Sequence, residues 1–108
     1  QGVQLRGAVD ADRFGASVSA PRDLDGDGGA DILVGAPGAD TAYVFYGPHT
    51  GVRSATAADR TLAGDAGSAA GASVLGPGDL DGDGYGDLLV GAPGLLGGTA
   101  WIATGGGL

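Results

Sequence analysis

Asp23-Leu24-Asp25-Gly26-Asp27-Gly28-Gly29-Ala30-Asp31 returns later in the same chain as Asp79-Leu80-Asp81-Gly82-Asp83-Gly84-Tyr85-Gly86-Asp87. Each copy places aspartates at positions 1, 3, 5 and 9 of a nine-residue loop, with glycines at positions 4 and 6. Four carboxylates so close together repel one another strongly unless a cation lies between them. Ca²⁺ suits such a loop, because it takes about six to eight oxygen ligands in a flexible geometry. The sequence therefore predicts two calcium sites per chain.

The repeated unit is longer than the acidic loop. Residues 15–37 align without a gap with residues 71–93, at an offset of 56. Shorter matches, shifted by one or two residues, extend the repeat in both directions: 5–7 with 62–64, and 42–47 with 100–105. A period of this length is typical of stacked or radially arranged supersecondary units. We therefore expect a single module, 1–108, made of a first repeat at about 1–58 and a second at about 59–108.

Both units are predicted to be β-structure. Short apolar runs are interrupted by Gly, Pro and Asp, no window has a helical apolar period, and 25 of the 108 residues are glycine. Four strands are expected in each unit. They fall at residues 4–6, 15–20, 31–35 and 42–46 in the first, and at 60–63, 71–75, 87–91 and 99–103 in the second.

The order of motifs identifies a family resemblance. Arg13-Phe14-Gly15-Ala16-Ser17-Val18, then the acidic loop, then Val34-Gly35-Ala36-Pro37 resembles an FG-GAP repeat, the repeat of the integrin α-subunit β-propeller. In the second copy Ala70 stands in place of Phe14, which we expect to weaken one packing contact. The resemblance implies an all-β fold of two four-stranded antiparallel β-propeller blades.

The resemblance also assigns the calcium ligands. Side-chain oxygens would come from the four aspartates of each loop and a backbone carbonyl from the seventh residue. The implied metal residues are Asp23, Asp25, Asp27, Gly29 and Asp31 in the first loop, and Asp79, Asp81, Asp83, Tyr85 and Asp87 in the second.

Composition excludes some functions. The net charge is −8, and all thirteen acidic residues are aspartates, eight of them in the two loops. Two bound Ca²⁺ ions would bring the charge to −4, so the acidity is mainly a property of the loops. Nucleic-acid binding would need a basic patch, which is absent from the sequence. No apolar run is long enough to insert into a membrane, and the resemblance implies an extracellular or cell-envelope location.

No catalytic residue is expected. The chain has one histidine and no cysteine, lysine or glutamate, so most nucleophile–base combinations are unavailable. His49 lies in a turn-like segment beside Gly47 and Pro48, where a solvent-exposed position is expected. The sequence therefore indicates a protein that is not an enzyme.

Apolar residues after each acidic loop predict the core. Both faces of an inner blade strand are covered, so continuous apolar runs are expected there. We expect burial against the neighbouring blade for Ile32, Val34, Leu88 and Val90, with Leu33 and Leu89 on the opposite face. The aromatic residues Tyr43, Phe45, Tyr46 and Trp101 are expected to pack between sheets. The alternative is an exposed aromatic patch that binds a partner or a sugar.

Three functions remain open on the sequence. The first is a calcium-binding β-propeller module for protein or cell-surface recognition, as in cell adhesion. The second is a purely structural, self-assembling pair of blades or a fragment, and the third is an accessory or carbohydrate-binding domain of a secreted hydrolase. Two blades cannot close a propeller, which usually takes about four to eight. We therefore expect a head-to-tail homo-oligomeric ring, with a trimer of six blades favoured and the strand at residues 4–6 completing the last blade of the next copy.

Overall fold

The computed structural model describes residues 4–22, 31–47, 51–78, 87–94 and 97–103, and the account below concerns these residues. They form β-strands joined by turns, as the sequence predicted. The strands are β1 (Gln4–Arg6), β2 (Ser17–Arg22), β3 (Asp31–Ala36), β4 (Thr41–Phe45), β5 (Val52–Ser54), β6 (Arg60–Ala63), β7 (Ser73–Gly78), β8 (Asp87–Ala92) and β9 (Thr99–Ala103). Short 3₁₀ helices also occur: η1 (Asp10–Asp12), η2 (Pro37–Ala39) and η3 (Ala55–Ala57).

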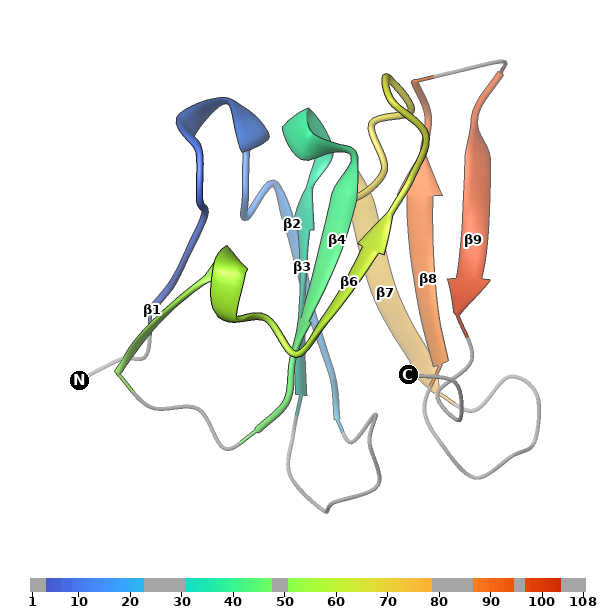
Figure 1. Cartoon of the computed structure of the whole chain (residues 1–108). Helices are drawn as coiled ribbons and strands as arrows, with labels where there is room; N and C mark the ends of the chain where they lie inside the picture. Colours follow the sequence, from blue (N-terminus) through green and yellow to red (C-terminus); the bar gives the residue numbers. More distant parts are fainter. Residues whose placement is uncertain (1–3, 23–30, 48–50, 79–86, 95–96, 104–108) are drawn as a thin grey trace.

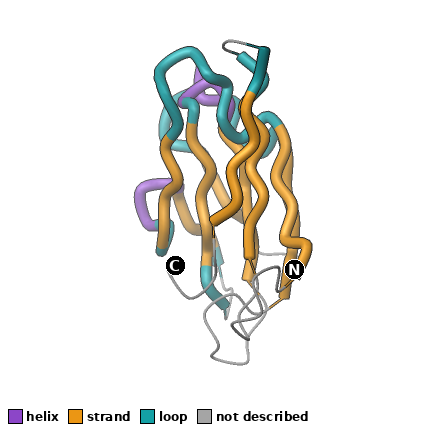
Figure 2. Tube along the Cα trace, turned by 90° about the vertical axis from the view of Figure 1, so that its right-hand side faces the viewer, coloured by secondary structure: helices purple, strands orange, loops and turns teal. Residues whose placement is uncertain are grey.

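Two antiparallel sheets carry the repeat. The first has the strand order β2-β3-β4-β6 and the second β7-β8-β9. Their registers correspond, since Val18 lies opposite Val34 as Val74 lies opposite Val90. The sheets stand next to each other in Figure 1, and the turned view in Figure 2 shows their strands running along one common direction. This arrangement is consistent with neighbouring blades of a β-propeller.

The number of strands differs between the two sheets. β6 pairs antiparallel with β4, so residues 60–63 complete the first sheet although the sequence period places them in the second repeat. The second sheet has three strands within the described residues. Two four-stranded blades therefore remain a prediction.

The N-terminal strand has a partner within the chain. β1 pairs in parallel with β5, with Leu5 opposite Arg53. The sequence predicted β1 but expected it to complete a blade of another copy, and it did not predict β5. The short parallel pair lies beside the first sheet in Figure 1.

A hydrophobic cluster fills the space between the two sheets. Leu33 on β3 and Leu88 on β8 are both fully buried in it. The other buried members are Ala42, Val44, Ala70, Val74, Val90 and Ala92, and the half-buried Tyr46, Leu62 and Trp101 pack against them. Burial of this apolar surface is the main force that holds the sheets together.

The two sheets use different faces for this cluster. Leu88 and Val90 are buried against the first sheet, as predicted. Val34 is buried but does not belong to the cluster between the sheets, and Ile32 is only half-buried. In β3, however, Leu33 is the residue that faces the second sheet. Ile32 and Val34 lie on the other face of the first sheet, opposite Phe45 and Tyr43.

The backbones of the two sheets touch at a pair of glycines. The Ser17 hydroxyl donates a hydrogen bond of 2.8 Å to the Gly71 carbonyl. A Cβ atom on Gly35 would collide with this carbonyl oxygen, and one on Gly71 would lie 2.5 Å from the carbonyl oxygen of Thr41. Only glycine allows so close an approach of two backbones.

Candidate functional site

The ends of both acidic loops are held together by strand pairing. Arg22 at the end of β2 lies opposite Asp31 at the start of β3, and Gly78 lies opposite Asp87 in the second sheet. Each loop is therefore closed at its base, at the end where β3 and β8 start in Figure 1. The register of both hairpins also shifts just before the loop.

The ninth residue of each loop is a buried carboxylate. Asp31 and Asp87 are both 0% exposed. An oxygen of Asp31, Oδ1, accepts a hydrogen bond of 2.9 Å from the Gly47 backbone N–H, just beyond β4. Burial of a carboxylate is costly unless positive charge or hydrogen bonds compensate for it. The two aspartates thus occupy equivalent positions at which a cation would be favourable.

The other predicted ligands lie outside the described residues. They are Asp23, Asp25, Asp27, Gly29, Asp79, Asp81, Asp83 and Tyr85. Within the described residues, no group of three or more His, Cys, Asp or Glu side chains could hold a metal ion. The ligand set predicted from the sequence consists of oxygen donors, which fits a hard cation such as Ca²⁺, and it stays a prediction.

An aspartate that the sequence did not single out joins the two repeats at their other end. Asp40, between η2 and β4, accepts hydrogen bonds from the backbone N–H groups of Gly67 (2.9 Å) and Ala69 (2.7 Å). Its carbonyl oxygen accepts a third, from Gly64 N–H at 2.7 Å. Asp40 has a φ of 53°, a left-handed conformation that aspartate tolerates better than most residues.

Aromatic rings cover the outer face of the first sheet. Phe14 lies 5.6 Å from Tyr43 and 6.2 Å from Phe45 between ring centroids. The Arg53 guanidinium lies 5.1 Å from the centroid of Phe45 and pairs with Asp59 at 3.1 Å. Arg53, on β5, therefore contacts the aromatic residues of the first sheet.

The second repeat fills the corresponding space differently. A Cβ atom on Gly64 would collide with the ring of Trp101 and would lie 2.7 Å from Ala70 Cβ. In the first repeat, a Cβ atom on Gly7 would lie 2.7 Å from Phe14 Cβ. Trp101 therefore reaches the region that Phe14 occupies in the first repeat, so the packing loss predicted for Ala70 is compensated.

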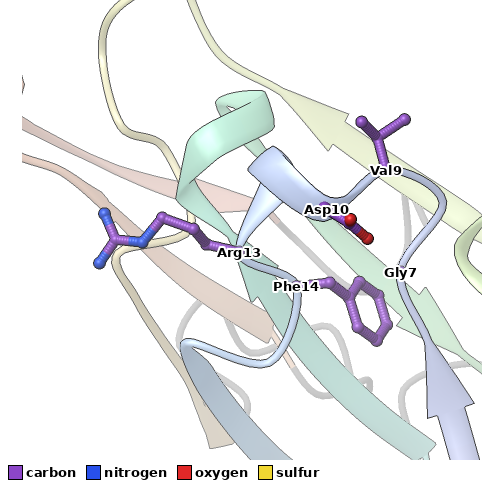
Figure 3. Close-up of a pocket in the computed structure, with 5 residues that line it drawn as sticks. All are labelled: Gly7, Val9, Asp10, Arg13 and Phe14. Atoms are coloured by element: carbon purple, nitrogen blue, oxygen red, sulfur yellow. The ribbon is translucent and has the colours of Figure 1, made fainter.

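The surroundings of Tyr43 change the pKa of its phenol. Partial burial raises the pKa of the Tyr43 phenol, and the negative charge of Asp12 raises it further. Asp12 belongs to η1, which stands beside a shallow pocket of about 210 Å³ lined by Gly7, Val9, Asp10, Arg13 and Phe14 (Figure 3).

The comparison with known families agrees with this architecture. Residues 23–90 match the FG-GAP-like repeat family, over both acidic loops and the strands between them. The chain belongs to this family. The FG-GAP segments are also similar to integrin alpha-5 of Xenopus laevis, with 41% identity over 101 residues covering 84% of this chain. Integrin alpha-IIb of Homo sapiens is 41% identical over 98 residues, or 86% of the chain, and integrin alpha-PS5 of Drosophila melanogaster is 36% identical over 89 residues, or 76%.

This FG-GAP repeat protein corresponds to a small part of those relatives. It covers 9% of the length of each of the three integrin α chains. Among the described residues, no helix has the length and apolar character needed to cross a membrane.

Proposed function

We propose that this chain is a calcium-binding β-propeller module that recognises protein or cell-surface ligands and has no catalytic activity. The observation that carries the proposal is the equivalent burial of Asp31 and Asp87, each at the base of a closed hairpin loop. Membership of the FG-GAP-like repeat family supports the recognition role. The similarity to integrin α chains supports an extracellular or cell-envelope location.

Each loop would hold one Ca²⁺ ion through its aspartates and one backbone carbonyl. The first site would use Asp31 and the second Asp87 as the ligand that also begins a buried strand. When bound, the ion supplies positive charge that offsets the repulsion among the carboxylates. The resident cation is structural in this proposal, because it fixes the loop and the hairpin to which the loop belongs.

Further blades are needed to complete a propeller, and one uncovered face supports their presence. Leu75 lies opposite Leu89, and Leu89 lies opposite Ile102, in a row across the second sheet. Leu75 and Ile102 are 52% and 58% exposed. The equivalent row of the first sheet includes Leu33 and Val44, both fully buried by the second sheet. The ring of three copies predicted from the sequence is one possible source of the missing blades.

The aromatic residues argue against a carbohydrate-binding domain. Phe45 is fully buried, and Phe14, Tyr43, Tyr46 and Trp101 are half-buried. Within the described residues, no exposed aromatic side chain offers a flat platform for a sugar. A purely structural blade pair remains the rival function, and a ligand-binding measurement separates it from a recognition module.

The metal proposal is tested by removing and restoring calcium. A cation that binds only the folded chain adds about 3–4 kcal/mol to the free energy of unfolding at a few hundred times its Kd. Urea unfolding in Ca²⁺ and in excess chelator should differ by this amount for each bound ion, and titration calorimetry should give two ions per chain. Asp31→Ala and Asp87→Ala should each remove one ion.

Two controls separate metal binding from local structure. Asp31→Asn keeps an oxygen that can accept the Gly47 N–H but loses the charge, so it too should lose the first ion. Asp65→Ala removes an exposed aspartate outside the loops and should leave both ions bound. Unfolding curves that coincide with and without chelator would refute the calcium proposal.

A further inference from the structure

Asp40 connects the first repeat to the second through three hydrogen bonds. The Asp40 carboxylate takes up the N–H groups of Gly67 and Ala69, and its carbonyl takes up Gly64 N–H. All three donors belong to the segment that leads from β6 into the second sheet. A hydrogen bond with an ionised acceptor is roughly twice as strong as a neutral one. This contact therefore joins Asp40, which follows the Gly35-Ala36-Pro37 segment of the first repeat, to residues 64–69 of the second. We call residues 64–69, and the corresponding residues 7–13 of the first repeat, the entry loops.

The entry loop of the first repeat has the same backbone conformation as that of the second. Arg13 has a φ of 57° where Ala69 has 56°. The N–H of the preceding residue donates three residues back in both loops, at 3.1 Å in residues 9–12 and at 3.0 Å in residues 65–68. By this correspondence, Gly7, Ala11 and Arg13 are the equivalents of the three residues that hold Asp40.

A pocket lies at the entry loop of the first repeat, in the place where the counterpart of Asp40 from another repeat would bind. Two of the three equivalents, Gly7 and Arg13, line it together with Val9, Asp10 and Phe14. Figure 3 shows the Arg13 side chain directed away from the ring of Phe14, so Arg13 offers its backbone rather than its guanidinium to this region. Within the described residues, no side-chain acceptor bonds the N–H of Ala11 or Arg13, whereas the Asp40 carboxylate bonds those of Gly67 and Ala69.

The local charge does not distinguish the two loops. Asp10 lines the pocket and would repel a carboxylate, and Asp12 lies two residues further on. Arg13 offsets one of these charges, so residues 9–13 carry a net charge of −1. Residues 65–69 carry the same net charge through Asp65, and that loop nevertheless holds the Asp40 carboxylate.

We propose that this pocket binds the aspartate carboxylate of another FG-GAP repeat. That repeat packs against the first sheet in the same way that the first sheet packs against the second. The occupant carries an aspartate immediately before its third strand, as Asp40 immediately precedes Thr41. Its carboxylate accepts hydrogen bonds from Ala11 and Arg13, and its backbone carbonyl accepts one from Gly7.

The second repeat of this chain lacks the required residue. Gly98 immediately precedes Thr99 and has a φ of 93°, where Asp40 has a φ of 53°. A neighbouring copy that presents its second sheet would therefore bring no carboxylate to the pocket, and its Asp40 is already held by Gly67 and Ala69. The fitting partner is a repeat other than the two in this chain, which disfavours the homo-oligomeric ring.

Docking also has a backbone consequence. β6, which precedes Gly64, runs antiparallel along β4. By the same correspondence β1, which precedes Gly7, would run along the third strand of the docked repeat. It would then leave the three-residue parallel pair that it forms with β5.

The test gives the second repeat the missing carboxylate. In Gly98→Asp, the chain becomes complementary to its own first repeat, whereas Gly98→Asn adds a side chain of the same size without the charge. A Cβ atom at position 98 has room, since its nearest neighbour is Pro93 Cα at 3.5 Å, and the strain of a side chain at a φ of 93° is the same for both variants. Sedimentation equilibrium at fixed Ca²⁺ should give a dissociation constant for Gly98→Asp about ten-fold lower than that for Gly98→Asn.

Two further measurements locate the effect in the pocket. Adding Asp10→Ala to Gly98→Asp removes the repelling carboxylate, matches Ala66 of the second loop, and should tighten association further. Amide hydrogen exchange at Ala11 and Arg13 should slow in the Gly98→Asp assembly.

The proposal stays testable if single chains associate too weakly to measure. Two complete chains joined by a flexible linker raise the effective concentration of the contact to about millimolar. In that tandem, Asp and Asn are compared at position 98 of the leading copy. Equal amide protection of Ala11 and Arg13 in the trailing copy, or equal dissociation constants for the two single-chain variants, would overturn the proposal.

Discussion

The two repeats fill one equivalent space with different pairs of side chains. In the first repeat Phe14 packs on Tyr43, and in the second the small Ala70 leaves room for the larger ring of Trp101. A loss of volume on the entry loop is thus matched by a gain on the third strand. The comparison teaches that the space between these two elements is preserved, whereas the residue that fills it is exchangeable.

A second difference concerns the faces of the sheets. Leu33 and Leu89 hold the same position in the two repeats, but Leu33 is fully buried and Leu89 is half-buried. The first has a neighbouring sheet on its side and the second does not, within the described residues. Equivalent residues can therefore differ greatly in their contribution to stability.

The largest expected effect separates these two leucines. Leu33→Asp would bury an unpaired charge between the sheets and should cost about 4 kcal/mol or more, enough to prevent folding. Leu89→Asp should cost about 1 kcal/mol, because its side of the sheet is reached by water. Circular dichroism and urea unfolding of both variants measure the difference, and equal losses would mean that another structure covers Leu89.

An intermediate effect is expected from exchanging the aromatic pairs. Ala70→Phe overfills the second repeat while Trp101 is present and should destabilise the fold by about 1–3 kcal/mol. Adding Trp101→Tyr recreates the pair of the first repeat and should recover part of this loss. A double-mutant cycle by urea unfolding measures the coupling, and strictly additive effects would show that the two side chains do not share one space.

A smaller effect, expected at high pH, distinguishes Tyr43 on β4 from its equivalent Trp101 on β9. The raised pKa of Tyr43 means that the folded chain holds this phenol neutral more strongly than the unfolded chain does. Its contribution is fully present below the unfolded pKa of about 10 and is lost as pH rises through the folded pKa. Trp101, its equivalent, does not titrate.

Urea unfolding between about pH 8 and 11 should show this loss in the parent chain and a shallower one in Tyr43→Phe. Tyr46→Phe is the matched control, because it removes a phenol hydroxyl just beyond the end of β4 and leaves Tyr43 in place. Identical pH slopes for the parent and Tyr43→Phe would contradict the effect.

The smallest effect is expected at Tyr46. Its hydroxyl is buried and has no hydrogen-bond partner in the described structure. Tyr46→Phe removes a polar group that gains nothing from burial, so at neutral pH it should leave stability unchanged or raise it by about 1 kcal/mol. Tyr46→Ala, which also removes the ring from the core, should destabilise clearly. A loss in Tyr46→Phe as large as that in Tyr46→Ala would reveal a partner for the hydroxyl.

Much of the strand pattern could be predicted from the sequence, because apolar runs bounded by Gly, Pro and Asp mark short strands well. β1, β6 and β9 have the bounds that were expected, and β3 and β8 start at the predicted aspartates. β5 was missed because Val52-Arg53-Ser54 has no apolar run, and its parallel pairing depends on a distant segment.

Two features were harder to predict: which face of each sheet meets the other sheet, and the contact of Asp40 with the second repeat. Alternation shows that Leu33 points away from Ile32 and Val34, but a continuous apolar run does not say which face meets the next sheet. The sequence did not single out Asp40, because its partners lie 27 and 29 residues away. Of the predicted calcium ligands, Asp31 and Asp87 are described and occupy equivalent buried positions, which agrees with the repeat.

The contact between Gly35 and Gly71 limits how such a structure can be redesigned or diverge. With backbone against backbone, the two sheets approach here as closely as atoms permit, and any side chain at either glycine would push them apart. The spacing of the two sheets at this contact thus depends on the absence of a methyl group at both positions. Gly91, the counterpart of Gly35, would collide with only the Ser73 side chain among the nearest atoms. Its tolerance of alanine would therefore report whether a third sheet has been built against the second.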